Sequence, residues 1–229
     1  MSLSTPKPEP TVNAKNRGYL KIEGAARAFN FDFRNKVVLD IGSSTGGFTQ
    51  YALDRGAKKV IAIEKGTNQM IKPLRFDKRI DLHEKTDIFT VRIKNNFTED
   101  RLRQREQLAS EPRNDGRERS GSEVKLFLIP DIIVADVSFI SLTKVLQYAK
   151  DNLVNNKTEF LVMLKPQFEA KPDQLNKGIV KNEKVRRQII KDFEQWLKHH
   201  DFIIKNKRDN TLKGKTGNLE RFYYLTLAK

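Results

Sequence analysis

The sequence of 229 residues contains no cysteine. This absence excludes disulfide bonds and thiolate metal ligands, and it is typical of proteins from a reducing compartment. No apolar run approaches the roughly 20 residues that a membrane-spanning helix needs. The N-terminal M-S-L-S-T-P-K-P-E-P has no apolar segment of a secretory signal, and the three histidines lack metal-ligand spacing. We therefore expect a soluble, cytoplasmic protein with no integral membrane insertion and no metal.

Apolar residues are also scarce, at 38% of the chain with a mean hydropathy of −0.63. They gather in short, β-rich segments such as V-V-L-D-I-G, V-I-A-I-E, I-I-V-A-D-V and F-L-V-M-L-K. Helical patterns separate these segments, and this alternation predicts an α/β fold with a doubly wound, mostly parallel sheet. We expect strands at 37–41, 59–64, 80–84, 132–136 and 160–165, with helices at 47–55, 69–75 and 142–152.

The C-terminal third adds a helix and a pair of strands. Apolar residues at helical spacing predict a helix over 184–199, and the alternating pattern of 221–227 predicts a strand that pairs with 202–205. We expect this pair to add an antiparallel C-terminal strand to the parallel sheet.

The rest of the chain is organised around this single domain, which we place at 17–229. Residues 1–16 are rich in proline, lysine and asparagine and are expected to form a flexible basic arm. An amphipathic helix follows from Arg17, with Leu20, Ala25, Ala28 and Phe29 expected on its buried face. The stretch 95–124 is dense in charge and poor in apolar residues, which predicts a charged insertion outside the core.

The charge is strongly unbalanced. Lys and Arg number 44 against 29 Asp and Glu, which gives a net charge of +15 and a pI of about 9.9. Such a surplus points to a polyanionic partner, because each cation that neutralises a phosphate releases condensed counterions. A solvated basic surface is a plainer explanation, and an anionic membrane is a third, although no clustered basic amphipathic helix stands out.

The segment V-V-L-D-I-G-S-S-T-G-G-F-T joins an apolar strand to a helix through a glycine-rich turn. Small residues let the backbone approach a ligand. A phosphate-binding loop would need Lys where Phe48 stands, and a dinucleotide loop would need a second glycine that is missing here. The pattern fits better the loop that packs against the amino-acid part of S-adenosyl-L-methionine. The candidate cofactor-binding residues of this segment are Asp40, Gly42, Ser43, Ser44, Thr45, Gly46, Gly47 and Phe48.

Glu64 supports the same interpretation. It lies 22 residues after Gly42, at the end of the second strand, where an acidic residue can accept hydrogen bonds from ribose hydroxyls. An ordinary tight turn followed by a chance acidic residue is the alternative. Asp87, after the third strand, is a candidate contact for the adenine amine or, equally simply, a helix N-cap.

At D-I-G-S-S-T-G-G-F-T and R-G-A-K-K-V-I-A-I-E the chain resembles the FtsJ-like methyltransferases, and specifically their TlyA (hemolysin A) branch. The resemblance continues in N-R-G-Y-L-K, D-V-S-F-I-S-L, L-K-P-Q-F-E-A, K-G-I-V and G-N-L-E. It covers the chain from about Arg17 onward apart from the insertion. The resemblance implies a Rossmann-like fold, S-adenosyl-L-methionine as cofactor, and 2′-O-methylation of ribose in ribosomal RNA, on its own or within a ribosomal subunit. TlyA proteins usually carry a small RNA-binding domain before the catalytic one, whereas about 16 residues precede the first motif here.

The resemblance also implies a catalytic Lys-Asp-Lys-Glu tetrad without a metal. Its members would be Lys21, Asp136, Lys165 and Glu220, with Asp136 also close to the cofactor. Asp136 and Lys165 end neighbouring strands and should face the carboxyl edge of the sheet, where ligands of such folds bind. We expect Lys165 to be the base, because apolar surroundings and the second ammonium of Lys21 disfavour its charged form. Asp136 and Glu220 would then orient the lysine and the ribose hydroxyl. Gln167–Glu169 are expected to touch substrate.

Two other classes of function stay open. The first is an RNA- or ribosome-binding protein that keeps the fold and has lost catalysis, and the intact tetrad argues against it. The second is the direct membrane-lytic activity that the hemolysin label suggests, for which the sequence offers no spanning segment and no strongly hydrophobic amphipathic helix.

Overall fold

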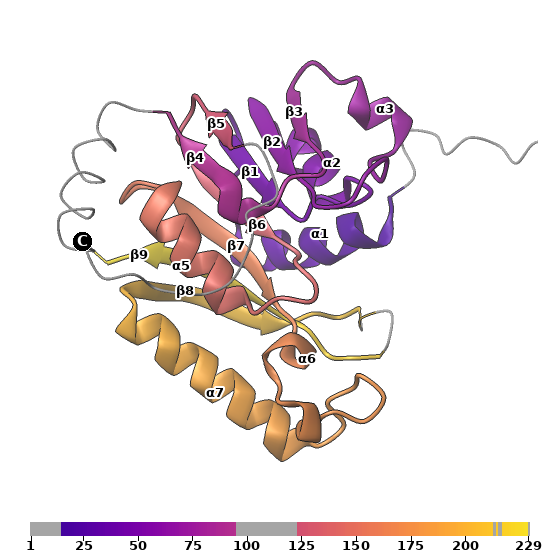
Figure 1. The fold of residues 1–229 in the computed structure, drawn as a ribbon, viewed down its shortest axis with the longest axis vertical. Helices are drawn as coiled ribbons and strands as arrows, with labels where there is room; N and C mark the ends of the chain where they lie inside the picture. The colour runs from indigo at the N-terminus through magenta and orange to yellow at the C-terminus, as the bar shows by residue number, and fades with distance from the viewer. Residues whose placement is uncertain (1–14, 95–122, 213, 215–216, 229) are drawn as a thin grey trace, which may run out of the picture.

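A computed structural model describes residues 15–94, 123–212, 214 and 217–228 of the chain (Figure 1). Its centre is a seven-stranded sheet in the order β3-β2-β1-β6-β7-β9-β8. The first five strands of this order are parallel, and β9 runs antiparallel to both β7 and β8. The predicted α/β class, the parallel sheet and the antiparallel C-terminal strand are confirmed. The strands are β1 (Val37–Ile41), β2 (Lys59–Ile63), β3 (Ile80–His83), β6 (Ile132–Ala135), β7 (Glu159–Leu164), β8 (Phe202–Asp209) and β9 (Arg221–Leu227).

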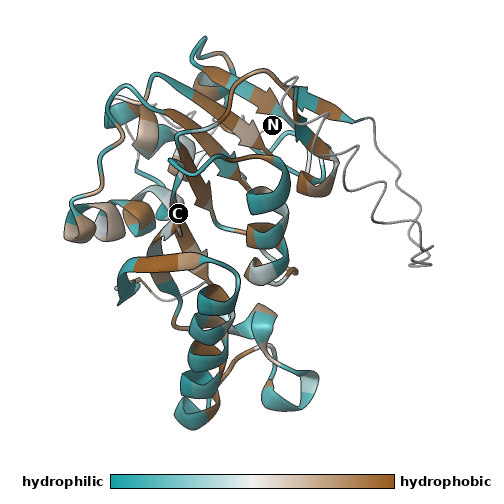
Figure 2. Cartoon of the chain, turned by 90° about the vertical axis from the view of Figure 1, so that its left-hand side faces the viewer, coloured by the Kyte–Doolittle hydropathy of each residue, from teal (hydrophilic) through white to brown (hydrophobic). Residues whose placement is uncertain are grey.

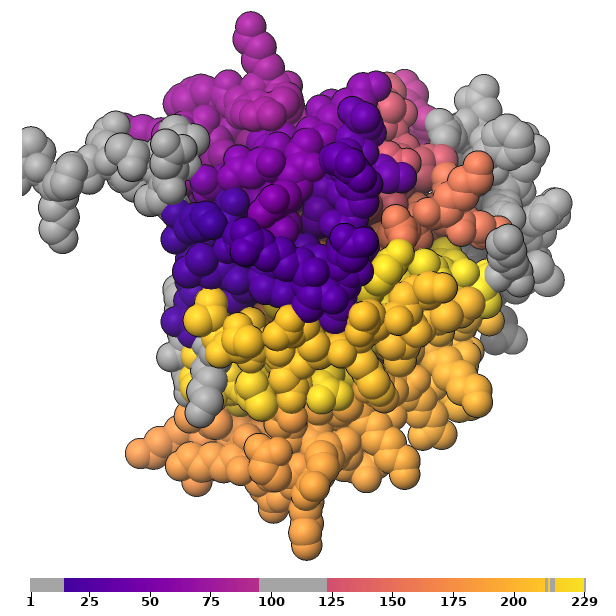
Figure 3. All heavy atoms as spheres, turned by 180° about the vertical axis from the view of Figure 1, so that it is seen from behind, coloured from indigo at the N-terminus to yellow at the C-terminus, as the bar shows by residue number. Residues whose placement is uncertain are grey.

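Helices cover both faces of the sheet. One face packs against α1 (Arg17–Phe29) and α2 (Gly47–Asp54), and the other packs against α5 (Leu142–Asn152) and α7 (Glu183–His199). Successive strand residues alternate between these two cores, so the apolar runs of the sequence are buried on both sides. Seen from behind in Figure 3, α1 (indigo) lies against the C-terminal strands (yellow). Figure 2 shows hydrophobic residues concentrated in the strands, whereas α7 is largely hydrophilic on its outer surface.

The buried face of α1 agrees in part with the predicted one, since Ala25 and Phe29 are buried as expected. Leu20 is 41% exposed and Ala28 is exposed, whereas Tyr19, Lys21 and Ile22 are buried. The prediction was therefore wrong for two of its four residues. The hydrophobic pattern did not show that this face includes Lys21, whose side chain has the carboxylate of Glu220 as its partner inside the protein.

The short elements were predicted less well. The helix expected over 69–75 is the single turn α3 (Lys72–Arg75), and no strand was expected for β4 (Val91–Ile93) or β5 (Val124–Leu126). These two pair in parallel as a separate small sheet. Val124 thus belongs to a strand and not to the insertion, whose residues 95–122 lie outside the described ranges.

The remaining short helical turns are η1 (Ile88–Thr90), α6 (Pro166–Glu169) and η2 (Pro172–Gln174). The first follows β3 and the other two follow β7, so all three lie on the side of the sheet to which the parallel strands point. This is the edge at which open α/β sheets bind their ligands.

Candidate active site

A cleft of about 2510 Å³ opens at the carboxyl ends of the parallel strands. Its walls are formed by the segments that follow β1, β2, β3, β6 and β7, together with the start of α1 and Glu220, and it extends along α5 to the end of α7. A pocket for one small molecule usually measures about 300–1,000 Å³. This cleft is therefore large enough for a cofactor and for part of a larger substrate.

The loop after β1 has the close backbone approach that its glycines predicted. Gly42 has a φ of +81°, and a Cβ placed there would lie 3.2 Å from the backbone oxygen of Asp136. Gly46 has a φ of +90°, and a Cβ there would lie 2.5 Å from Leu74 Cδ1. Backbone conformation thus disfavours a side chain at both positions, and the space is tight at Gly42 and too small at Gly46. Of the eight candidate residues in this segment, the cleft is lined by Gly42, Ser43, Ser44, Thr45, Gly47 and Phe48, but not by Asp40 or Gly46.

Asn16 lines the cleft beside this loop, whereas the sequence analysis placed it in a flexible arm. Its side chain accepts a hydrogen bond from the backbone N–H of Tyr19 at 2.9 Å, which caps α1. Its amide also donates to the hydroxyl of Thr45 at 3.3 Å. A Cβ on Gly47 would fall 2.3 Å from Asn16 Oδ1, so glycine at this position makes room for the cap.

Glu64 follows β2 and turns its carboxylate toward the same loop. One oxygen accepts the backbone N–H of Ser44 at 2.8 Å, and the other accepts that of Gly66 at 2.7 Å. The side chain is largely buried but lines the cleft. Each carboxylate oxygen can accept two hydrogen bonds. Glu64 is thus held in place by the backbone. Its Oε1 also accepts the side-chain amide of Gln69 at 3.5 Å, so it is Oε2 that retains a lone pair for a ribose hydroxyl.

Asp40 lies beneath the loop and not in the cleft. It is fully buried, Thr49 donates a hydrogen bond to its Oδ2 at 2.6 Å, and its Oδ1 has no partner within the described residues. Burial raises the pKa of Asp40 to about 7, and the negative charges of Asp136 and Glu64 act in the same direction. The residue ties the end of β1 to α2, so it supports the cofactor loop from below.

Asp87 lines the cleft and also caps a helical turn. Its Oδ1 accepts the backbone N–H of Phe89 at 3.2 Å at the start of η1, and its Oδ2 pairs with Lys65 at 3.1 Å. The N-cap alternative is therefore observed. Contact with an adenine amine stays a prediction.

The four residues of the proposed tetrad all line the cleft, and they form two lysine–carboxylate pairs. Lys165 Nζ lies 2.6 Å from Asp136 Oδ1, and Lys21 Nζ lies 2.7 Å from Glu220 Oε2. The side chains are 11% and 21% exposed in the first pair but only 8% and 3% in the second. The adjacent parallel strands β6 and β7 bring the first pair together, as predicted. Its greater exposure leaves it the more accessible to a substrate.

Ser138 and Phe139 lie close to the Lys165–Asp136 pair, and the sequence analysis assigned neither of them a role. Lys165 Nζ donates to the hydroxyl of Ser138 at 2.8 Å. Phe139 is 92% exposed, has a φ of +62°, and places its ring 5.2 Å from that of Phe168. A bulky residue in the left-handed region is an outlier of the kind that gathers at binding sites. The only signal in the sequence was their place in the string D-V-S-F-I-S.

Two residues of the segment Gln167–Glu169 lie at the cleft, and their contact with substrate stays a prediction. Gln167 and Phe168 line the cleft, whereas Glu169 does not. Glu169 accepts hydrogen bonds from the Ser141 hydroxyl at 2.6 Å and the Leu142 N–H at 2.7 Å, and burial raises its pKa. Glu169 therefore holds the start of α5 and does not face the substrate side.

Among the described residues, no three His, Cys, Asp or Glu side chains lie together in a way that would hold a metal ion. Within the same ranges, no helix combines the length and the hydrophobicity needed to cross a bilayer.

Comparison with known proteins places this geometry in a family context. Residues 14–226 match the family model of FtsJ-like methyltransferases. The 23S rRNA (cytidine-2′-O)-methyltransferase TlyA of Campylobacter jejuni is 33% identical over 213 residues, which cover 91% of this chain and 69% of that protein. Hemolysin A of Brachyspira hyodysenteriae is 34% identical over 201 residues, which cover 87% of this chain and 71% of that protein.

A solved structure gives the same result in three dimensions. A Lactococcus lactis protein provisionally named a hemolysin has a TM-score of 0.73 to this chain at 30% identity. The alignment covers 92% of this chain and 87% of that one.

Proposed function

Because the chain belongs to the FtsJ-like methyltransferase family, we propose that it transfers a methyl group from S-adenosyl-L-methionine to a ribose 2′-hydroxyl of ribosomal RNA. The observation that carries this proposal is the convergence of two lysine–carboxylate pairs on the cleft that also holds the glycine-rich loop. The curated relatives named as 23S or 16S/23S rRNA (cytidine-2′-O)-methyltransferases support the substrate class. A ribosomal substrate would place this activity in the cytoplasm.

The residues around the loop fit S-adenosyl-L-methionine. The backbone from Gly42 to Phe48 would hold its amino-acid part, Glu64 its ribose hydroxyls and Asp87 its adenine amine. The hydroxyl of Ser43 is buried at the cleft without a partner in the described ranges, so it is available to a bound ligand. When bound, this cofactor supplies an electrophilic methyl group.

The residues of the chain would supply orientation and a base. Asp136 and Ser138 both lie within hydrogen-bond distance of Lys165 Nζ, so they fix the position of the amino group. Lys165 would accept the proton of the 2′-hydroxyl, which is otherwise a poor nucleophile, and the carboxylate of Asp136 would stabilise the ammonium that results. The apolar surroundings that the sequence suggested for Lys165 are not observed, since Asp136 and Ser138 lie next to its amino group. The more deeply buried Lys21–Glu220 pair lines the cleft with charged groups that would orient the hydroxyl by hydrogen bonding.

Features around the cleft suit RNA. The net charge of +15 favours a polyanion, and the exposed ring of Phe139 beside Phe168 offers a surface on which a nucleobase can stack. A base that stacks on an aromatic ring gains about 1–3 kcal/mol. Stacking here would bring the attached ribose close to Lys165, whose Nζ lies 5.8 Å from the ring of Phe168.

Replacing Gly42 by valine should weaken S-adenosyl-L-methionine binding by at least about tenfold, because the side chain would enter the wall of the cleft beside Asp136. The matched control is Gly56→Val. Gly56 has a similar φ of +86° but follows α2 away from the cleft, so its valine carries the same backbone strain. Calorimetry on both variants measures the cofactor affinity, with thermal unfolding recorded in parallel. Equal affinity in the two variants would contradict the cofactor assignment.

The reaction itself is tested with cofactor that carries a radiolabelled methyl group and with bacterial ribosomal RNA. Alkaline hydrolysis cleaves RNA through the free 2′-hydroxyl, so a 2′-O-methylated nucleotide survives within an alkali-stable dinucleotide. We expect the label in this fraction and none in DNA of matched sequence. Label in mononucleotides would indicate base methylation. RNA binding without label transfer would favour the degenerate binding protein, and dye release from liposomes by the cofactor-free protein would favour the membrane-active alternative.

A further inference from the structure

Two motifs of the sequence interlock in the structure. Asn218, in G-N-L-E, accepts a hydrogen bond from the backbone N–H of Val180 at 3.0 Å and donates one to the carbonyl of Gly178 at 3.0 Å. Both partners belong to K-G-I-V, which lies 38–40 residues earlier in the chain. Asn218 is only 2% exposed. Its side chain therefore acts as a buried clamp between the two segments.

The clamped segment is a tight hairpin with a lysine at its tip. Asn176 and Ile179 exchange both backbone hydrogen bonds, at 2.9 and 3.0 Å. Between them Lys177 has a φ of +48° and Gly178 a φ of +75°, as in a two-residue type I′ turn. Glycine suits its position because of backbone conformation, since a Cβ there would meet nothing within 4 Å. Lys177 carries the cost of a left-handed backbone conformation that glycine would avoid, and its side chain is exposed to solvent.

Glu220 follows Asn218 by two residues in the same segment. The carbonyl of Leu219 accepts a hydrogen bond from the buried Arg186 at 3.3 Å, and the carbonyl of Glu220 accepts the N–H of Asn210 at 2.8 Å. The backbone around Glu220 is therefore fixed. Through Asn218, the hairpin is fixed relative to the Lys21–Glu220 pair of the cleft.

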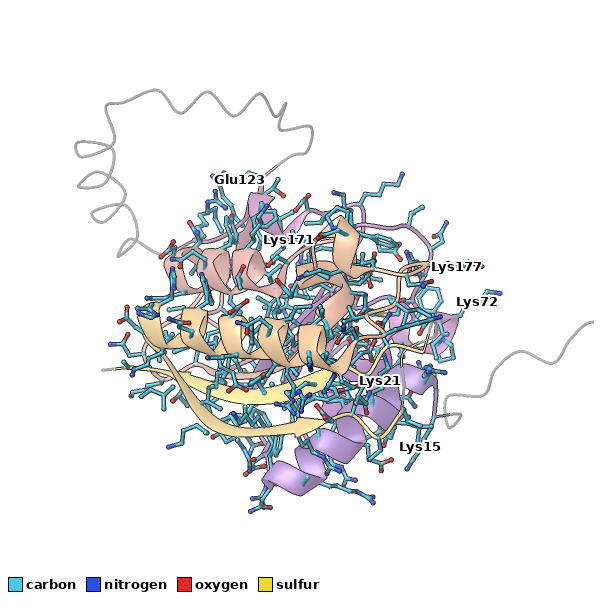
Figure 4. The ribbon with its side chains drawn as sticks, turned by 90° about the horizontal axis from the view of Figure 1, so that it is seen from below. Lys15, Lys21, Lys72, Glu123, Lys171 and Lys177 are labelled. Carbon is cyan, nitrogen blue, oxygen red and sulfur yellow. The ribbon has the colours of Figure 1, made fainter. Side chains whose placement is uncertain are left out.

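The residues that flank the hairpin in the sequence, 171–187, include more exposed cations than exposed carboxylates. Two exposed carboxylates, Asp173 and Glu183, stand against five exposed cations. No ion pair joins any of these cations to a carboxylate in the described part of the chain. In Figure 4, Lys177 lies near the right-hand edge of the view, on the same side as Lys21 and Lys72. The five cations are Lys171, Lys177, Lys181, Lys184 and Arg187.

We propose that the hairpin Asn176–Ile179 is a contact for the phosphodiester backbone of the RNA substrate, with Lys177 as its cation. Asn218 positions this contact relative to Glu220, so that a strand held at the hairpin enters the cleft in a defined register. The proposal rests on the proposed function, because it takes the polyanion to be the RNA that is methylated. A lysine on this turn suits a phosphate, because no carboxylate of the described residues pairs with its charge and the hydrogen-bonded turn fixes the backbone from which its side chain extends.

The test measures RNA affinity as a function of salt without cofactor, with a labelled stem–loop oligoribonucleotide as the probe. Loss of one phosphate contact lowers the slope of log K against log [salt] by about 1. We expect this decrease for Lys177→Gln. The matched control is Lys58→Gln. Lys58 is exposed and directly precedes β2, so it lies at the amino ends of the parallel strands, away from the cleft at their carboxyl ends. An unchanged slope for Lys177→Gln, or the same decrease for Lys58→Gln, would overturn the proposal.

The clamp is tested by Asn218→Ala and by its combination with Lys177→Gln. If Asn218 acts on RNA by holding the hairpin, the double variant should bind RNA no more weakly than the weaker single variant. Strictly additive losses would show that Asn218 does not work through Lys177. Should Asn218→Ala unfold, Gly178→Val disturbs the turn and keeps every charge, and it should reproduce the reduced salt slope. These measurements need no methyl transfer, so their failure and that of the proposed function are distinguishable.

Discussion

Replacing Lys165 by alanine should lower turnover by a factor of roughly 10² to 10⁴, with little change in cofactor affinity. The amino group would be the one that accepts the ribose proton, and its removal leaves solvent and the weaker base Asp136 for this step. Asp136 and Ser138 would remain, but neither places a basic nitrogen at this point of the cleft. Single-turnover methyl transfer to ribosomal RNA and calorimetry with the cofactor measure the two quantities separately.

Lys165→Arg separates this role from a structural one. A guanidinium stays protonated at any working pH, so it keeps the ion pair with Asp136 and cannot act as a base. We expect this variant to be nearly as slow as Lys165→Ala. If Lys165 only joined the ends of β6 and β7, the arginine enzyme would stay active and the alanine enzyme would lose stability together with activity.

The stability control is Lys150→Ala, which removes a lysine–carboxylate pair of the same length outside the cleft. Lys150 Nζ lies 2.6 Å from Asp201 Oδ2, and its side chain is 23% exposed. Exposed pairs of this kind contribute about 0–1 kcal/mol. The Lys165–Asp136 pair is the more buried of the two, so Lys165→Ala should lose more stability than Lys150→Ala. Turnover is therefore compared at a temperature at which thermal unfolding shows both variants folded, and only Lys165→Ala should lose it. An active Lys165→Arg enzyme would rule out the general base and leave the fold and the cofactor site unaffected.

The strands and long helices could be predicted because each leaves its own pattern in the sequence. A run such as V-V-L-D-I is buried on both faces of the sheet and reads as a continuous apolar segment, and α7 repeats apolar residues at helical spacing. The three-residue strands β4 and β5 are too short to show any period, and their pairing depends on contacts across the chain. The face of α1 was predicted only in part, because hydrophobicity alone cannot indicate that a lysine is buried with a distant glutamate.

The site could be predicted where chemistry follows from local sequence. The glycines of the β1–α2 loop and the two strand-terminal residues Asp136 and Lys165 lie where the motifs placed them. Phe139 could not be found in this way, because its positive φ and exposure depend on the surrounding fold. Asn16 and Asn218 were missed for a related reason. Their roles arise from hydrogen bonds to segments that are 29 and 38–40 residues away in the sequence.

Replacing Lys21 by methionine should destabilise the protein by about 3–5 kcal/mol, which is the usual cost of breaking a buried ion pair on one side. Lys21 and Glu220 are 8% and 3% exposed, so the substitution leaves the glutamate charge buried without its cation. Exchanging both partners for apolar side chains of similar size is often neutral. The double variant Lys21→Met/Glu220→Met should therefore recover most of the lost stability, as measured by denaturant unfolding.

Turnover should not recover with stability. In the proposed mechanism the Lys21–Glu220 pair orients the ribose hydroxyl, and two methionines offer no hydrogen bond to it. The double variant should thus fold like the parent, bind S-adenosyl-L-methionine through the unaltered loop and Glu64, and transfer methyl groups at a small fraction of the parental rate. If the pair served only to fill the space between α1 and β9, stability and turnover would return together. That result would remove Lys21 and Glu220 from the chemistry and leave Lys165 and Asp136 as its only candidates.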